Sequence, residues 1–357
     1  MASGDKNRRT YIGSVGLAFL LGLSLGLDVP DATLTGAASG GRGGCGGGGG
    51  ETHPGLCVAD SDCMAPEFCQ NDACVEPTLS NSCFRATDFE ETAHSSENSG
   101  RALSYLWSEA KGALTLDERS EAEELLNAIY LLFVEEFGFP VITAPVRFRV
   151  FSDSDTYNRC MLVMDRPEGG SPAYSRSHDT IFFLKSSQSW ELTLRILLHE
   201  GVHFIFRHAG VRPGSTVFNE GAAVFMSTIS KEQRGGQEVL VISPHQARYE
   251  PMLTGLWEHN RFLNMETLLG FSNTEWQQNS GVAYAQSYSI IYFLMELHRS
   301  DMREIFSGLL RRGPPAVGNK ELIEEAYGSS SGDAFEQFVL DWEAWLEREH
   351  QSITFNP

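Results

Sequence analysis

The chain is poor in basic residues. It contains 27 Lys and Arg against 47 Asp and Glu among 357 residues, which gives a formal net charge of −20. Nucleic acids and anionic membrane surfaces attract proteins of the opposite sign, so this balance argues against either as the main partner. The hydrophobic share of 41% is that of an ordinary globular protein with a core. We therefore expect a globular chain with no nucleic-acid partner.

The apolar run near the N-terminus is short and rich in glycine for a membrane-spanning helix. Lys6, Arg8 and Arg9 precede this run, which covers residues 11–27. A charged stretch followed by an apolar one is typical of a signal peptide. We expect residues 1–27 to export the chain, so that it is secreted or held in the cell envelope. An uncleaved N-terminal anchor is the alternative, and it would be the only contact with a membrane.

Cysteine is sparse outside one cluster. Four of the 7 cysteines lie in "CVADSDCMAPEFCQNDAC", at Cys57, Cys63, Cys69 and Cys74. No pair has the CxxC spacing and no histidine lies between them, which argues against a zinc module. In an exported chain such density is typical of two disulfide bonds. We expect a cysteine-rich module at 57–76 behind a flexible glycine-rich linker at 28–56. Of the three possible pairings we favour Cys57–Cys69 with Cys63–Cys74.

Internal repeats are also lacking, and residues 101–357 have the pattern of one domain after a linker at 77–100. Apolar residues recur at helical spacing in "LDERSEAEELLNAIYLLFVEEFG", which ends at Gly138. "PVRFRVFSD" and "DTIFFLK" have the composition of strands. Further helical patterns cover 221–230, 282–299, 302–311, 320–326 and 334–349. The sequence predicts a mostly helical α+β domain with a small sheet.

One helical segment, "RILLHEGVHFIFRH", carries polar residues in an otherwise apolar run. A helix that is apolar all round is buried, and burying polar groups costs free energy unless they are satisfied. His199 and His203 are four residues apart, so they project from one face of the helix and can bind one metal ion. With Glu200 they form the HExxH pattern of zinc-dependent peptidases. The alternative is a pair of buried histidines bonded to neighbouring groups.

A third ligand is needed, and its position distinguishes the families. A metzincin would need Gly at 206 and His at 209, where this chain has Phe206 and Ala209. Glu220, in "VFNEGAAVFM", begins another apolar helix and would complete a site with two histidines and one glutamate. Such a site leaves the fourth zinc position to water, and it suits zinc better than calcium or magnesium. We expect one zinc per chain. Alternatively, Glu220 only faces the helix dipole.

The motifs "HEGVH" and "NEGAA" together resemble the gluzincin clan of zinc metallopeptidases, and most closely its bacterial peptidase-MA-like group. "YAQSYSIIYFL", from Tyr284, and "EEAYGSSSGDAFEQFVLDWEAWL" are similar to later helices of that group. The resemblance covers about residues 180–346. It implies hydrolysis of peptide or protein substrates, with His199, His203 and Glu220 as zinc ligands and Glu200 as general base. It also implies that Tyr284 donates to the oxyanion.

Several points stay open within this resemblance. Tyr288 lies one turn after Tyr284 and could replace it as donor, or both tyrosines could belong to the core. Many gluzincins have an Asp where this chain has Val224, so another group must orient the first histidine. Asp179 and Glu191 are the candidates.

The strand "DTIFFLK" would be the sheet edge along which a peptide substrate pairs, although it could equally be an ordinary structural strand. Two rival functions also remain. One is a surface binding protein whose metallopeptidase-like domain is inactive, and the other is a zinc hydrolase acting on a non-peptide amide.

Overall fold

The computed structural model describes most of the second half of the chain and parts of the first. The described residues are 68–70, 73–75, 89–95, 102–110, 112–163, 173–175, 178–185, 189–211, 216–234, 236–242, 250–311, 318–328 and 333–354. The segment expected to export the chain and the glycine-rich linker lie outside them. No helix among the described residues has the length and apolarity needed to cross a membrane.

The cysteine-rich module is described only as two short backbone strands. Strand β1 (Phe68–Gln70) pairs antiparallel with β2 (Ala73–Val75), which sets Cys69 opposite Cys74 along the backbone. The other two cysteines of the module lie outside the described residues. The disulfide pairing therefore stays a prediction.

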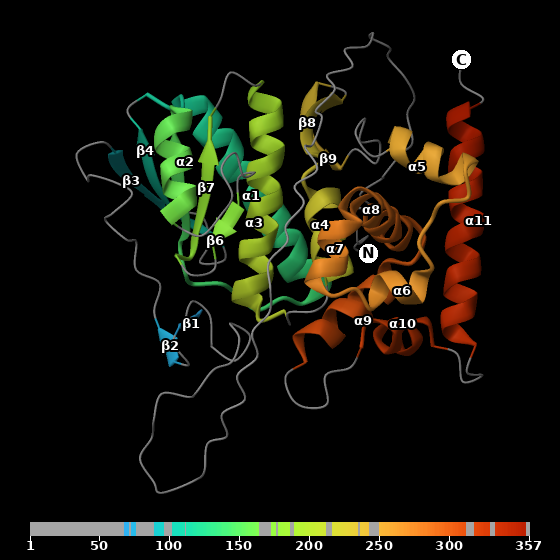
Figure 1. Cartoon of the computed structure of the whole chain (residues 1–357). Coiled ribbons are helices and arrows are strands. Elements are labelled where there is room, and N and C mark those ends of the chain that lie inside the picture. Colours follow the sequence, from blue (N-terminus) through green and yellow to red (C-terminus); the bar gives the residue numbers. More distant parts are fainter. Residues whose placement is uncertain are drawn as a thin grey trace, which may run out of the picture. The chain divides into compact units, whose positions relative to one another are not determined.

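A five-stranded mixed sheet supports one side of the domain (Figure 1). Its strands run in the order β3-β4-β5-β7-β6, and β4, β5 and β7 are mutually parallel whereas the two outer pairings are antiparallel. The bounds are β3 (Phe89–Ser95), β4 (Ser104–Ala110), β5 (Val146–Phe151), β6 (Ala173–Ser175) and β7 (Thr180–Leu184). The predicted mostly helical α+β domain with a small sheet is thus confirmed, as are the two predicted strands.

Two expectations about the sheet change. Residues 89–95, assigned to the linker, form β3 and pair with β4 along their whole length. Of the two alternatives for "DTIFFLK", the sheet edge is wrong and the ordinary structural strand is confirmed, because β6 pairs with β7 on its outer side. Both changes have one cause. A strand of three residues, or one rich in polar residues such as β3, acquires its conformation from its partner rather than from its own pattern.

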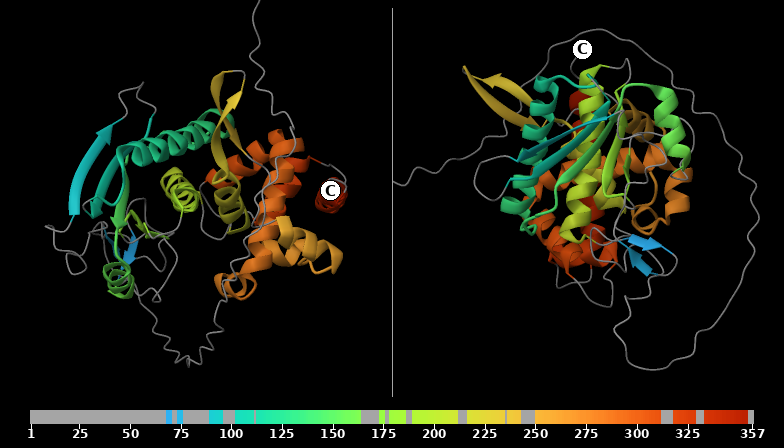
Figure 2. Two further views of the ribbon diagram at one scale, coloured as in Figure 1. Left: turned by 90° about the horizontal axis from the view of Figure 1, so that it is seen from above. Right: turned by 90° about the vertical axis from the view of Figure 1, so that its left-hand side faces the viewer.

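Helices cover both faces of the sheet (Figure 2). Helix α2 (Ser154–Val163) closes a small apolar cluster on one face with Phe151 and Phe182. On the other face lie α1 (Leu116–Phe137) and α3 (Trp190–Ala209) within the main core. Helix α1 begins with a capping box between Thr115 and Glu118 and ends at Gly138, whose φ of 71° is left-handed. The terminal glycine is the stop signal on which the prediction of α1 relied, and the capping box satisfies N–H groups of its first turn.

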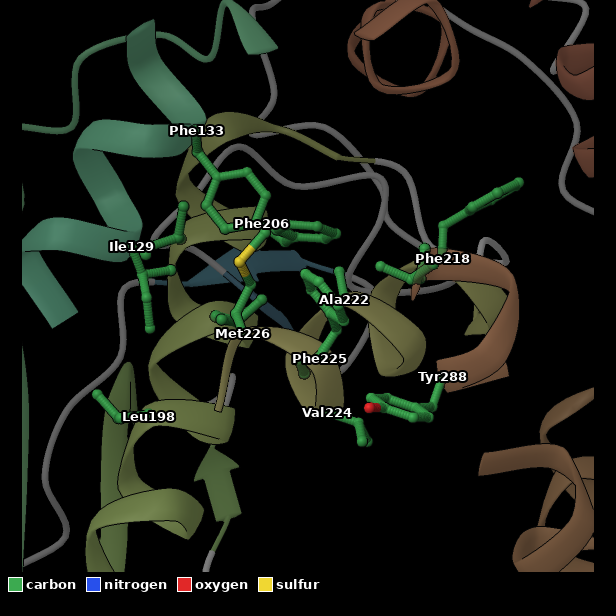
Figure 3. Packing of buried hydrophobic residues seen from close by; sticks show 14 of the residues in the cluster. Ile129, Phe133, Leu198, Phe206, Phe218, Ala222, Val224, Phe225, Met226 and Tyr288 are labelled. Carbon is green, nitrogen blue, oxygen red and sulfur yellow. The ribbon is translucent and has the colours of Figure 1, made fainter. Parts of the chain in front are cut away.

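Helix α3 packs closely on α1 through a glycine. A Cβ atom on Gly201 would collide with the side chain of Leu126 on α1. In Figure 3, Ile129 and Phe133 of α1 lie next to Leu198 and Phe206 of α3. The glycine inside the helix that carries His199 and His203 is therefore explained by helix packing.

Helix α4 (Thr216–Met226) lies between α3 and the long helix α8 (Ser280–Leu297). It is shorter at its C-terminal end than the predicted helix at 221–230. The hydroxyls of Ser227 and Thr228 donate to the carbonyls of Val224 and Phe225, which satisfies groups at the end of the helix. The chain then enters a hairpin of β8 (Ile229–Arg234) and β9 (Gln237–Ile242).

The C-terminal part of the domain is helical around α8. It comprises α5 (Glu250–Glu258), α6 (Met265–Leu269), α7 (Asn273–Gln278), α9 (Arg299–Leu310), α10 (Asn319–Tyr327) and α11 (Ala334–Thr354). Its role for the site is to hold α8 against α4.

Candidate metal centre

Helix α3 brings two imidazoles together on one face. Nε2 of His199 lies 3.1 Å from Nε2 of His203, and the two rings are nearly perpendicular at 89°. Both side chains are mostly buried, with 18% of the surface of His199 and 15% of that of His203 exposed. Two ring nitrogens therefore converge at one point on one face of α3.

Helix α4 places a carboxylate at the same point. Oε2 of Glu220 lies 3.4 Å from Nε2 of His199 and 3.3 Å from Nε2 of His203. The three atoms thus form a triangle with nearly equal sides. Zinc held tetrahedrally at about 2.0–2.1 Å from each ligand would keep the ligand atoms about 3.3–3.4 Å apart. The donor types and their separations fit that ion.

Glu200 lies beside this triangle but has a different environment. Its carboxylate is buried, and Oε2 accepts a hydrogen bond of 2.7 Å from the backbone N–H of Tyr174 on β6. His199, Glu200 and His203 form a group that could hold a metal ion. Either carboxylate is thus near enough to be the third ligand. Glu220 is the better placed of the two, because its Oε2 stands almost equally far from both imidazole nitrogens.

The second nitrogen of His203 is also held. Nδ1 lies 3.1 Å from Oδ1 of Asn219. A carboxamide oxygen can only accept, so Nδ1 carries a proton, and Nε2 is the nitrogen left to bind a metal ion once the ring is neutral. The sequence analysis missed Asn219. The sequence feature that could have indicated Asn219 is its position directly before the proposed ligand Glu220, near the start of α4.

The two candidates for orienting His199 lie elsewhere. Asp179 is fully buried and bonds to Tyr174, His208 and Arg147. Glu191 forms an exposed ion pair with Arg195 one turn along α3. The described hydrogen bonds and ion pairs of the two carboxylates do not include His199, because the partners of a carboxylate depend on tertiary packing rather than on its position along the chain.

The charges at the site shift two pKa values in opposite directions. Burial disfavours the charged form of His203, but the Glu220 carboxylate outweighs it and raises the pKa of His203 to about 9. Burial would raise the pKa of Glu220, yet the imidazoles of His203 and His199 hold that pKa well below its ordinary range. The metal-free site therefore holds an ionised carboxylate against a protonated imidazole.

The two tyrosines of α8 have separate environments. The ring of Tyr284 lies 6.4 Å from that of His199 and 5.4 Å from that of Trp276 on α7, measured between centroids. Burial, followed by the nearby charge of Glu220, raises the pKa of Tyr284. A hydrogen bond with Trp276 lowers this pKa by less, and the charge of Glu200 makes a still smaller contribution that raises it. Tyr284 is therefore a neutral phenol next to the imidazoles.

Tyr288 belongs to the core instead. Only 1% of its surface is exposed, and its ring lies 6.2 Å from those of Phe225 and Tyr292. Figure 3 shows it beside Phe225 and Val224 of α4. One helical turn thus separates a tyrosine at the site from one in the apolar interior.

No known family model matches the chain. No curated protein matches it either. What the chain does is therefore inferred from the chemistry of this site.

Proposed function

We propose that the chain is an exported zinc metallopeptidase with a gluzincin-like catalytic domain. The observation that carries this proposal is the triangle of His199 Nε2, His203 Nε2 and Glu220 Oε2, with sides of 3.1, 3.3 and 3.4 Å. Its donor set and separations suit one zinc per chain with a fourth position open to water. Export follows from the charged and apolar N-terminal segment, and the acidic composition gives no reason for a nucleic-acid partner.

Two helices supply the three proposed zinc ligands. The two imidazoles come from adjacent turns of α3, and the Glu220 carboxylate comes from α4. Asn219 keeps the proton of His203 on Nδ1, so that Nε2 is free to coordinate. A bound zinc would polarise the scissile carbonyl and acidify the attacking water.

Glu200 acts as the general base in this proposal. One of its oxygens already accepts the N–H of Tyr174, which fixes the carboxylate beside the ligand triangle. The other oxygen takes the proton of the water and passes it to the leaving amine. Accepting the N–H of Tyr174 occupies one carboxylate oxygen of Glu200, and the carboxylate also lies beside the ligand triangle. This favours an enzyme over a binding protein with an inactive domain.

Tyr284 supplies the hydrogen bond to the oxyanion. Its raised pKa keeps the phenol protonated, so that it donates without losing a proton. Strand β6, the outer strand of the sheet, replaces β7 as the edge beside which an extended peptide would lie.

Cleavage of a peptide library by purified protein tests this function. We expect cleavage that stops with a zinc chelator, returns with added zinc and is lost in the Glu200→Gln protein. Cleavage that survives both treatments would contradict a zinc mechanism. Hydrolysis of small non-peptide amides without cleavage of any peptide would assign the same chemistry to a different substrate. Zinc binding without any hydrolysis would favour the binding protein.

A further inference from the structure

The edge strand β6 meets the metal-binding helix through one residue. Tyr174, in the middle of β6, contacts Glu200 and Phe204 directly and is linked to His208 through Asp179. These three residues of α3 follow one another four positions apart. The backbone N–H of Tyr174 donates to Glu200 at 2.7 Å, and its ring meets Phe204 edge-on at 6.0 Å between centroids. Residues at this spacing share one face of a helix. A single stripe of α3 therefore faces β6.

Asp179 connects Tyr174 to His208, the third residue of this stripe. Its Oδ1 accepts from the hydroxyl of Tyr174 at 2.6 Å and lies 2.8 Å from Nε2 of His208. Its Oδ2 accepts from Arg147 of β5 at 3.0 Å. An ionised carboxylate only accepts, so Nε2 of His208 carries a proton. One fully buried carboxylate thus joins β5, β6 and the last turn of α3.

The backbone at Asp179 restricts which residue can do this. Its φ is 46°, in the left-handed region, where Asp and Asn are the best tolerated residues after glycine. The position therefore needs both a left-handed conformation and a buried acceptor. Asp supplies both, and Asn keeps the conformation while it loses the charge.

The bond to Glu200 depends on where β6 lies. Strand β6 has only three residues, and it pairs with β7 on one side alone. Few ladder hydrogen bonds can hold so short an edge strand in place. The bond from the Tyr174 hydroxyl to Asp179 adds a fixed contact at the residue whose N–H meets Glu200.

We infer that Asp179 and the Tyr174 hydroxyl are positioning groups for Glu200. They hold β6 against α3, so that the N–H of Tyr174 fixes one oxygen of the carboxylate and leaves the other for proton transfer. The catalytic part of this inference rests on the proposed role of Glu200 as base. A displacement of about 1 Å at a reacting group costs about 10²-fold in rate, so loosening β6 lowers turnover.

The test compares Tyr174→Phe and Asp179→Asn with a matched control. Tyr327→Phe is that control, because it also removes a tyrosine hydroxyl that donates to a carboxylate. Tyr327 lies on α10 and its acceptor Asp341 on α11. Tyr174→Phe keeps the aromatic ring, and the asparagine of Asp179→Asn can adopt the left-handed backbone. If one variant fails to fold, the other still tests the inference. The measurements are kcat, KM, zinc content and amide hydrogen exchange of a peptide covering β6.

We expect both variants to exchange the β6 amides faster and to lose about tenfold to a hundredfold in kcat, with zinc content unchanged. Tyr327→Phe should change none of these. Unchanged exchange in both variants would overturn the inference, and faster exchange with unchanged kcat would overturn its catalytic part. A wild-type protein without peptidase activity would refute the proposed function instead. The exchange measurement would still decide whether Asp179 holds β6, because it needs no substrate.

Discussion

Gly221 lies next to Glu220 at the closest approach of α4 to α8. A Cβ atom added there would stand 2.6 Å from the carbonyl oxygen of Ser287 and 2.8 Å from Cγ1 of Ile291. Ordinary contact begins at 3.4 Å, so the carbonyl contact is short by about 0.8 Å. Backbone of a packed helix cannot rotate away as a side chain can. Gly221→Ala must therefore push α4 away from α8 and move Glu220 relative to the imidazoles.

The magnitude follows from two opposing effects. Overpacking of this kind costs about 1–3 kcal/mol, whereas alanine favours a helix over glycine by about 0.8–1 kcal/mol. We expect the metal-free Gly221→Ala protein to lose up to about 2 kcal/mol of unfolding free energy. Each kcal/mol lowers Tm by about 2–4 °C. If the displacement of Glu220 weakens zinc binding by about 1.4 kcal/mol, the Kd for zinc rises about tenfold.

Thermal unfolding of the metal-free protein and a competition titration with zinc measure the two effects. Gly255→Ala is the matched control, because a Cβ atom on this residue of α5 would meet nothing within 4 Å. It should gain up to about 1 kcal/mol and leave zinc affinity unchanged. If Gly221→Ala behaves like Gly255→Ala in both assays, the close contact does not hold Glu220 in place.

Further predictions concern the chemistry of the site. Glu200→Gln should keep its zinc, measured by elemental analysis, and lose nearly all peptide hydrolysis, since an amide cannot take the proton; retained turnover would require another base. Tyr284→Phe should lose about 10²–10³ in kcat with KM nearly unchanged, whereas Tyr288→Phe should not; the reverse result would move the donor by one turn. Zinc binding at pH 7 should release about one proton, since His203 is protonated below its pKa of about 9 and a ligand must be neutral. Calorimetry in buffers of different ionisation enthalpy measures that release, and zinc affinity should tighten as pH rises toward 9. In the metal-free protein the raised pKa stabilises the fold fully below pH 6.5, and this contribution is lost as pH rises through 9.

Local patterns in the sequence were enough to predict the helices that carry the site. The run around His199 shows helical periodicity in an apolar segment, and α1 has a capping box and a terminal glycine. These features act between residues a few positions apart, so the sequence reveals them directly. The spacing of His199 and His203 on one helical face follows from the same local geometry.

Contacts between distant segments could not be predicted in this way. Strand β3 forms because β4 pairs with it, and β6 is an edge only because of where β7 lies. The bond from Tyr174 to Glu200 joins residues 26 positions apart, and nothing in either local pattern indicates it. Asp179 was expected near His199, yet its left-handed backbone and burial place it under Tyr174.

X-ray absorption at the zinc edge of the loaded protein tests the central claim most directly. We predict one zinc per chain, with two imidazole nitrogens and carboxylate and water oxygens, all at about 2.0–2.2 Å. Substituting Glu220 by Ala should remove the carboxylate from this shell and weaken binding. Sulfur ligands at about 2.3 Å would instead place the zinc among the cysteines of the N-terminal module and contradict the account. A full complement of zinc with an unchanged ligand shell in the Glu220→Ala protein would exclude that residue as a ligand.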